Sequence, residues 1–161
     1  MLWGHWKILG SRSERIRKMV IAMACDHAGY PLKITIKEHL KSRGIDVVDL
    51  GTDSEDPVDY PVYGKKLGEY VAAKKADLGV AVCGTGIGIS MACNKVKGIR
   101  CALCTSVEMG QKAKQHNNAN ILALGGRTTD PELAVKIVDA WLSESFLGQH
   151  HTRRIEMLDE M

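Results

Sequence analysis

The chain has 161 residues, 45% of them hydrophobic and 25% charged, which is typical of one globular domain with a sizeable core. Its apolar runs are too short to span a bilayer, and this excludes a membrane protein. The formal net charge is +3, but five of the 22 basic side chains and only one of the 19 acidic ones lie in the first eighteen residues. The remainder is therefore close to neutral, and nucleic acid is not an expected partner.

Residues 1–18 are expected to be a disordered N-terminal extension. They lack the apolar core of a signal peptide, and a weak organelle transit signal is the alternative. Residues 19–161 are then expected to form a single domain. The five cysteines are an odd number in mostly apolar surroundings, which favours free thiols and a cytoplasmic location over a disulfide framework. Cys101 and Cys104 form a Cys-x-x-Cys pair, but no second pair completes a zinc site. Two buried thiols are the expected interpretation, and no metal site is predicted.

Short apolar runs alternate with segments of helical periodicity along the chain. Strands are predicted at 19–24, 45–50, 77–82, 99–103 and 121–124. Helices are expected after each of them, and a last polar helix is predicted at 153–160. Within the helix that follows the third strand, Ile87, Met91 and Asn94 share one face. The alternation predicts an α/β fold, a three-layer α/β/α sandwich around a five-stranded, parallel, Rossmann-like sheet.

A glycine-rich loop follows the third predicted strand, with the sequence Cys-Gly-Thr-Gly-Ile-Gly from Cys83 to Gly88. Such a turn at a helix N-terminus points backbone N–H groups at one spot, which favours an anion or a developing oxyanion. A thiol beside a helix N-terminus ionises readily, so Cys83 could take a proton from a carbon next to a carbonyl. Thr85 could pass a hydroxyl proton. The loop has neither the Rossmann fingerprint nor a P-loop lysine, and a purely structural turn is the alternative.

Polar residues also follow two other predicted strands. Asp26 and His27 come after the first strand and Arg127 after the fifth. The carboxyl ends of parallel strands meet at one edge of a sheet, so these residues are expected near Cys83. A helix cap by Asp26 and a surface histidine are the structural alternatives.

Two further groups of candidates lie near the C-terminus. His116 and Asn117 belong to a polar run, where a histidine favoured by the helix dipole is the structural alternative. The segment from His150 to Arg154 is a cationic cluster. It is either a solvated basic face or a phosphate clamp, because guanidinium binds phosphate through two parallel hydrogen bonds.

Taken in order, these motifs resemble the ribose-5-phosphate isomerase type B family, the RpiB/LacAB sugar-phosphate isomerases. The resemblance covers roughly residues 18–158 and rests on the segments 26–29, 58–61, 83–88, 94–100, 116–120 and 126–127. It implies an aldose–ketose isomerase of the pentose phosphate pathway that interconverts ribose 5-phosphate and ribulose 5-phosphate through an enediolate. It also implies that no metal or cofactor takes part.

The resemblance implies a role for each matching position. Cys83 would be the base that moves the proton between C1 and C2, and Thr85 would assist at the substrate oxygens. His116 would help to open the furanose ring, and Asp26 would hold the sugar. The other implied substrate contacts are His27, Tyr60, Gly84, Gly86, Ile87, Gly88, Asn117, Arg127, His150 and Arg154.

In this family the site lies between two subunits, so a homodimer or a dimer of dimers is expected. The family's C-terminal Gly-Arg-His-x-x-Arg pattern places its second arginine at Arg154 and its first at His150. Either His150 takes that place or Arg153 compensates. Two alternatives stay open: an isomerase of a hexose 6-phosphate, such as allose or galactose 6-phosphate, and a catalytically silent phosphosugar-binding module.

Overall fold

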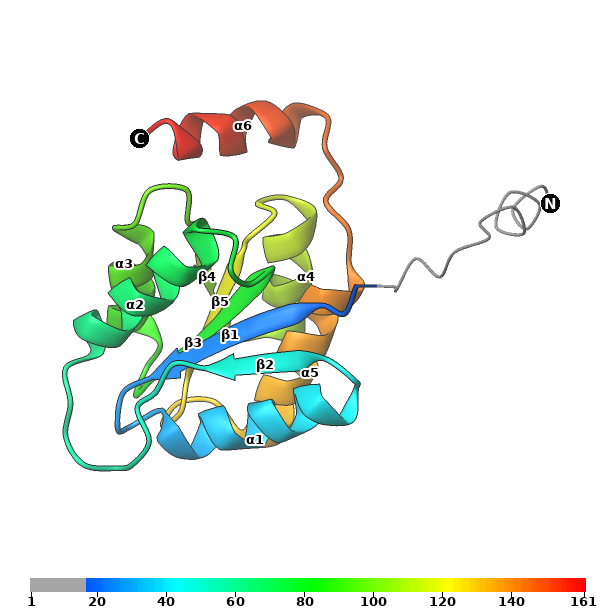
Figure 1. The fold of residues 1–161 in the computed structure, drawn as a ribbon. Coiled ribbons are helices and arrows are strands. Elements are labelled where there is room, and N and C mark those ends of the chain that lie inside the picture. Colours follow the sequence, from blue (N-terminus) through cyan, green and yellow to red (C-terminus); the bar gives the residue numbers. More distant parts are fainter. Residues whose placement is uncertain (1–16) are drawn as a thin grey trace, which may run out of the picture.

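The computed structural model describes residues 17–161, which fold around one central sheet (Figure 1). Its strands are β1 (Val20–Cys25), β2 (Asp46–Asp49), β3 (Leu78–Cys83), β4 (Cys101–Leu103) and β5 (Ile121–Gly125). All neighbouring pairs are parallel, in the order β2-β1-β3-β5-β4. The predicted strands are thus present, with ends that differ by at most two residues. The N-terminal extension was expected to be residues 1–18, and residues 1–16 of it lie outside the described part of the chain.

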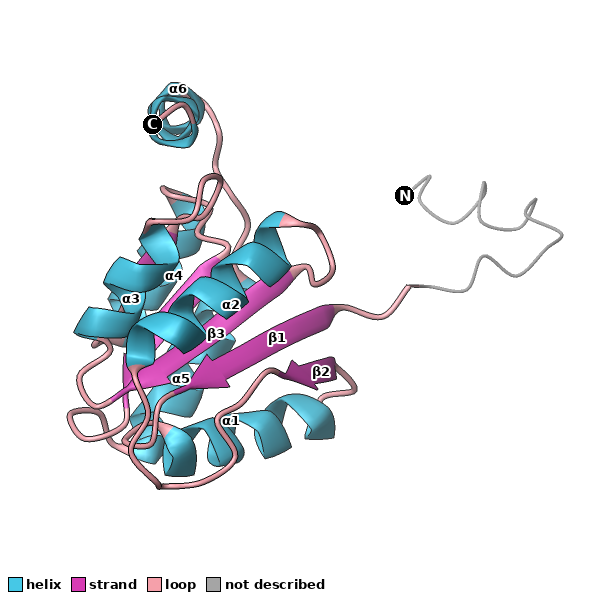
Figure 2. Ribbon diagram, turned by 60° about the vertical axis from the view of Figure 1, so that its left-hand side comes forward, coloured by secondary structure: helices cyan, strands magenta, loops and turns pink. Residues whose placement is uncertain are grey.

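Helices cover both faces of the sheet, which confirms the three-layer α/β/α sandwich (Figure 2). One face packs against α1 (Tyr30–Ser42), α4 (Val107–Gln115) and α5 (Pro131–Ser143). The other packs against α2 (Tyr60–Ala72) and α3 (Ile87–Asn94). Because both faces are covered, the inner strands are apolar throughout, and residues 21–25 of β1 are all fully buried.

The last helix, α6 (His150–Asp159), lies apart from the two helical layers, across the edge where the strands begin (Figure 1). It starts three residues earlier than the predicted range 153–160. Ile155 is its one buried side chain. The segment before it is held by a hydrogen bond of 3.0 Å from the Leu147 amide to the Gln115 carbonyl at the end of α4.

The strand order creates a switch point between β1 and β3. From β1 the chain moves outward to β2, and it then returns past β1 to β3. As a result, α1 and α2 cover opposite faces of the sheet. Ligands of open α/β sheets bind outside the carboxyl ends of the strands at such a point. Residues just after Cys25 and Cys83 are therefore favourably placed for a site.

The face that Ile87 and Met91 share points outward. Their side chains are 48% and 61% exposed, whereas α3 buries Ile89, Ser90 and Cys93 instead. Apolar residues at helical spacing therefore form a surface here and not part of the core of the single chain. Within residues 17–161, none of the helices has the length and apolar character needed to cross a membrane.

Candidate active site

The glycine-rich loop is fixed to the turn that follows β5. Cys83 is the last residue of β3, 4% exposed, and packs on the sheet face that α2 and α3 cover. Its carbonyl accepts a hydrogen bond of 2.8 Å from the Gly126 amide, and the Gly84 carbonyl accepts one of 2.9 Å from the Arg127 amide. The thiol is thus held where the strand ends and the loop begins.

Thr85 and Gly86 form the N-terminal end of α3. The Thr85 hydroxyl oxygen accepts a hydrogen bond of 3.2 Å from the Ile87 amide, which leaves its own proton available to a ligand. Gly86 has φ +78°, and a Cβ there would lie 2.9 Å from the Leu124 carbonyl carbon, so only glycine fits. The first amides of a helix have no partner within it. The loop therefore offers N–H groups and a hydroxyl beside a thiol, a combination that can stabilise an oxyanion.

Asp26 and His27 follow β1 at the same edge. The Asp26 side chain is 7% exposed, and its Oδ1 accepts a hydrogen bond of 3.0 Å from the Gly29 amide at the start of α1. The Asp26 amide donates to the Val82 carbonyl at 3.2 Å, which places it against the end of β3. His27 Nδ1 accepts a hydrogen bond of 3.1 Å from the Val58 amide. In the neutral ring the proton is therefore on Nε2.

Two glycines make room for larger side chains at this edge. A Cβ on Gly88 would lie 2.6 Å from the Tyr60 ring, so the tyrosine packs directly on the first turn of α3. A Cβ on Gly84 would lie 3.6 Å from Arg127 Cδ, so the arginine crosses the loop. Within residues 17–161, Arg127 makes no salt bridge with a carboxylate. A free guanidinium beside helix amides suits an anionic group.

His116 belongs to a different group of side chains. It caps the C-terminal end of α4, and its ring stacks on His151 of α6 with 4.2 Å between centroids and 13° between planes. His150 lies 4.1 Å from His151 on the same helix. Partial burial lowers the pKa of His151 below its usual value, and the neighbouring His150, His116 and Arg154 add to this effect. His151 thus lies between two predicted site residues, His116 and His150. The sequence analysis did not include His151 among the site residues.

Arg100 ties α6 to the loop that carries Asn117. Its Nη1 donates to both carboxylate oxygens of Asp159 at 2.6 and 2.8 Å. Its Nε and Nη2 donate to the carbonyls of Asn117 and Asn118, each at 3.0 Å. Sequence reasoning assigns Arg100 no role of its own, although it ends the segment 94–100 on which the family resemblance partly rests.

The two groups lie at opposite edges of the sheet. The register pairs Gly79 with Ile121 and Cys83 with Gly125. His116 precedes Ile121, whereas Cys83 lies four residues further along β3, which is about 13 Å of extended chain. Within one chain, the predicted residues that meet at the carboxyl edge are Asp26, His27, Tyr60, Cys83, Gly84, Thr85, Gly86, Ile87, Gly88 and Arg127. Those at the other edge are His116, Asn117, His150 and Arg154.

Other features lie outside these two groups. A cavity of about 480 Å³ between α2 and α3 is lined by none of the predicted site residues. All five cysteines are free thiols, and burial raises the pKa of Cys104 to about 11. Within residues 17–161, no cluster of three or more His, Cys, Asp or Glu side chains has the arrangement of a metal site.

Comparison with known proteins gives a consistent picture. Residues 21–158 match the family described as Ribose/Galactose Isomerase. Ribose-5-phosphate isomerase B of Escherichia coli is 45% identical over 138 residues, which cover 86% of this chain and 93% of that protein. Galactose-6-phosphate isomerase subunit LacB of Clostridium acetobutylicum is 47% identical over 144 residues, which cover 89% of this chain and 83% of that protein.

Solved structures share the fold over most of their length. A ribose 5-phosphate isomerase from Thermotoga maritima matches with a TM-score of 0.87 and 48% identity, covering 90% of this chain and 100% of that one. Ribose-5-phosphate isomerase B from Mycoplasma genitalium, solved with bound ribulose-5-phosphate, matches with a TM-score of 0.84 and 41% identity. That match covers 88% of this chain and 95% of the other.

Proposed function

Because the chain belongs to the ribose/galactose isomerase family, we infer that it is an isomerase that interconverts ribose 5-phosphate and ribulose 5-phosphate. The observation that carries this inference is the nearly full-length similarity to an isomerase solved with bound ribulose-5-phosphate. The thiol of Cys83 beside the helix amides supports it, because the reaction needs a base and an oxyanion site. The similarity to a galactose-6-phosphate isomerase subunit makes hexose 6-phosphates the natural comparison substrates.

In the proposed mechanism, isomerisation moves two protons of the open-chain sugar. Cys83, as a thiolate, takes the proton from C2 and returns it to C1. The Thr85 hydroxyl relays the other proton from O2 to O1. Between these steps the enediolate carries negative charge, which the amides of the first turn of α3 stabilise. The substrate and product have the same composition, and the enzyme ends each cycle unchanged.

The substrate is mostly a closed furanose, so the ring must open first. In our proposal, an imidazole takes the proton of the O1 hydroxyl and supplies one to the ring oxygen. His116 has this role, and His151 stacks against it. Because His116 lies at the edge opposite Cys83, it acts on substrate held at the carboxyl edge of another copy of the chain.

We therefore propose a homodimer in which each site takes the carboxyl edge of one chain and the α6 edge of the other. A two-fold axis then creates two equivalent sites. Large apolar side chains at both edges support such contacts, because they are exposed in the single chain; they are Ile87, Met91, Leu147, Met157 and Leu158. A dimer of dimers would keep the same pair of sites in each half.

Further parts of the proposal follow from the described residues. We propose that residues 19–161 form one domain, because a single sheet packs against α1 to α5 and Arg100 ties α6 to the same body. The five free thiols favour a cytoplasmic location, where thiols stay reduced. There the reaction would take its place in the pentose phosphate pathway.

A Cys83→Ala substitution tests the assignment of the base. Loss of an acid–base group lowers kcat by about 10²- to 10⁴-fold. The matched control is Cys104→Ala, which removes a buried thiol on the opposite face of the sheet and should leave kcat unchanged. Ribulose 5-phosphate formation is measured with purified proteins whose circular dichroism matches wild type. A folded Cys83→Ala enzyme with wild-type kcat would remove Cys83 as the base.

A panel of substrates tests the sugar. The full chain is incubated with ribose 5-phosphate, allose 6-phosphate and galactose 6-phosphate, and kcat/KM is compared. We expect the highest value for ribose 5-phosphate. A higher value for either hexose phosphate would assign the chain to the hexose branch of the family.

A further inference from the structure

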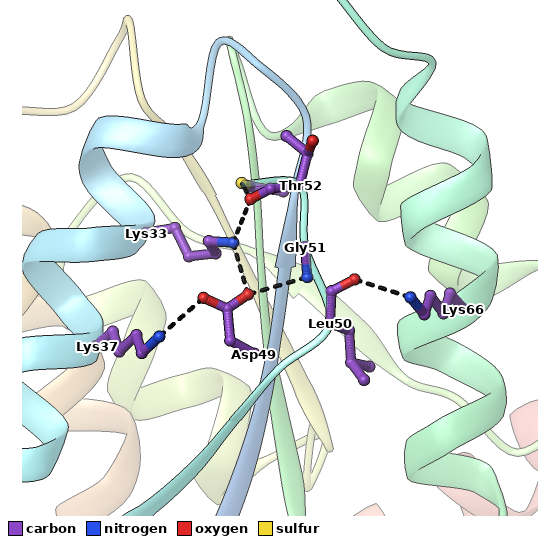
Figure 3. Close-up of polar contacts among 8 residues, drawn as sticks. Lys33, Lys37, Asp49, Leu50, Gly51, Thr52 and Lys66 are labelled. Carbon is purple, nitrogen blue, oxygen red and sulfur yellow. Dashed lines mark hydrogen bonds and ion pairs between the residues drawn. The ribbon is translucent and has the colours of Figure 1, made fainter. Parts of the chain in front are cut away.

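Lys33 is a buried cation close to the carboxyl edge. It is the fourth residue of α1, and its side chain is fully buried. Its Nζ donates to Asp49 Oδ1 and to the Thr52 carbonyl, both at 2.6 Å (Figure 3). A charge inside a protein is costly unless it is paired and hydrogen-bonded. The buried position of the charged lysine therefore depends on these two contacts.

Asp49 connects the lysine to the loop after β2. Its Oδ1 also accepts a hydrogen bond of 2.9 Å from the Gly51 amide, and its Oδ2 accepts one of 3.0 Å from Lys37 (Figure 3). Burial alone would raise the pKa of Asp49, but the hydrogen bonds from Lys33, Gly51 and Lys37 hold it below its usual value. The carboxylate is thus a charged anchor for the first residues of the loop.

The anchored residues continue the sheet beside β1. The Cys25 amide donates to the Gly51 carbonyl at 2.8 Å, and the Thr52 amide donates to the Cys25 carbonyl at 3.0 Å. Asp26 and His27 directly follow β1 in the sequence. The loop thus runs alongside the point where the proposed substrate contacts begin.

The far end of the loop also contacts residues of the proposed site at the carboxyl edge. The Val58 amide donates to His27 Nδ1 at 3.1 Å, and Tyr60 packs on Gly88. One continuous segment, residues 50–60, therefore forms a border of the proposed site. We call it the border loop.

We propose that Lys33 is a positioning residue for the isomerase, which fixes the border loop through Asp49 and Thr52 and so orients His27 and Tyr60 toward the substrate. This inference rests on the proposed function. Lys33 then takes no part in the chemical step itself. Cys83 and Thr85, which do, belong to β3 and the loop after it and not to the border loop.

Lys37 provides a matched control. It contacts the same carboxylate as Lys33 but, being partly exposed, it makes no contact with Thr52 in the structure. Lys37→Met thus removes one cation from Asp49 and leaves the tie to the loop. In contrast, Lys33→Met keeps an unbranched side chain of similar length and removes both contacts.

Kinetics with ribose 5-phosphate give the first test. For Lys33→Met we expect KM to rise about tenfold with kcat within about twofold of wild type, the pattern for lost substrate binding. Lys37→Met should change neither constant by more than about twofold. A folded Lys33→Met enzyme with wild-type KM would overturn the proposal, as would an equal loss in Lys37→Met.

Amide hydrogen exchange of the free protein gives a test that needs no activity. In Lys33→Met the amides of Thr52 and Val58 should exchange faster, while those of β3 keep wild-type protection. Unchanged exchange at Thr52 and Val58 would overturn the positioning role. If wild type does not isomerise ribose 5-phosphate, the proposed function fails and the exchange result still decides whether Lys33 fixes the loop. Should Lys33→Met not fold, Asp49→Asn weakens the same anchor and the same outcomes apply.

Discussion

Mixing two inactive variants tests whether the site is shared between chains. Cys83→Ala damages the carboxyl edge and His116→Ala the opposite edge. These edges lie about 13 Å apart along β3, so the two side chains belong to different ends of the sheet within one chain. In a shared site, however, a mixed dimer pairs the intact edge of each chain in one site and both damaged edges in the other.

The recovery can be worked out from the symmetry. Equal amounts of the two variants, allowed to exchange subunits at random, give mixed dimers as half of the total. Each mixed dimer has one intact site of two, so the mixture should reach about one quarter of wild-type activity. Each variant alone should remain at its own low rate.

The assay follows ribulose 5-phosphate formation before and after subunit exchange. Exchange is promoted by brief mild denaturation and dilution, and it is verified by native mass spectrometry of differently tagged chains. A mixture with abundant mixed dimers and no activity above the mean of the two variants would refute a shared site. High activity of His116→Ala alone would refute the role of His116.

Two further predictions concern charge. Arg154→Ala should weaken binding of ribose 5-phosphate about tenfold through the loss of a charge-assisted hydrogen bond. Arg153 is the neighbouring residue on α6, and its side chain leaves the helix in another direction. Arg153→Ala should therefore change the binding less than about twofold. Isothermal titration measures both, and equal effects would contradict the choice of Arg154. The pKa of Asp49 is lowered in the folded protein, so its contribution to stability is present above its unfolded pKa of about 4 and is lost as pH falls through the folded value. Urea midpoints should therefore fall more steeply toward acid pH in wild type than in Asp49→Asn, and parallel curves would exclude this contribution.

Much of the fold follows from local patterns. The apolar runs identified each strand because strands covered on both faces need apolar side chains throughout. The carboxyl-edge residues could also be predicted, because parallel strands bring their ends together.

Other features depend on tertiary contacts, which the hydrophobic periodicity of the sequence does not reveal. The helical spacing of Ile87 and Met91 was recognised, but whether that face meets the core or another chain depends on how α3 docks. The position of His116 at the opposite edge follows from the direction of α4. Lys33 was overlooked, although its spacing to Ile36 and Leu40 places a lysine on the buried face of α1.

The weak attachment of α6 to its own chain has a consequence for how activity arises in the cell. Beyond Ile155, this helix is held mainly by the Arg100–Asp159 pair and the stacked histidines. In the proposed dimer, a newly synthesised chain without a partner has a thiol edge that His116 of a second chain does not reach. Opening of the furanose ring then waits for assembly, so the reactive enediolate forms mainly where a second chain already shields it from water.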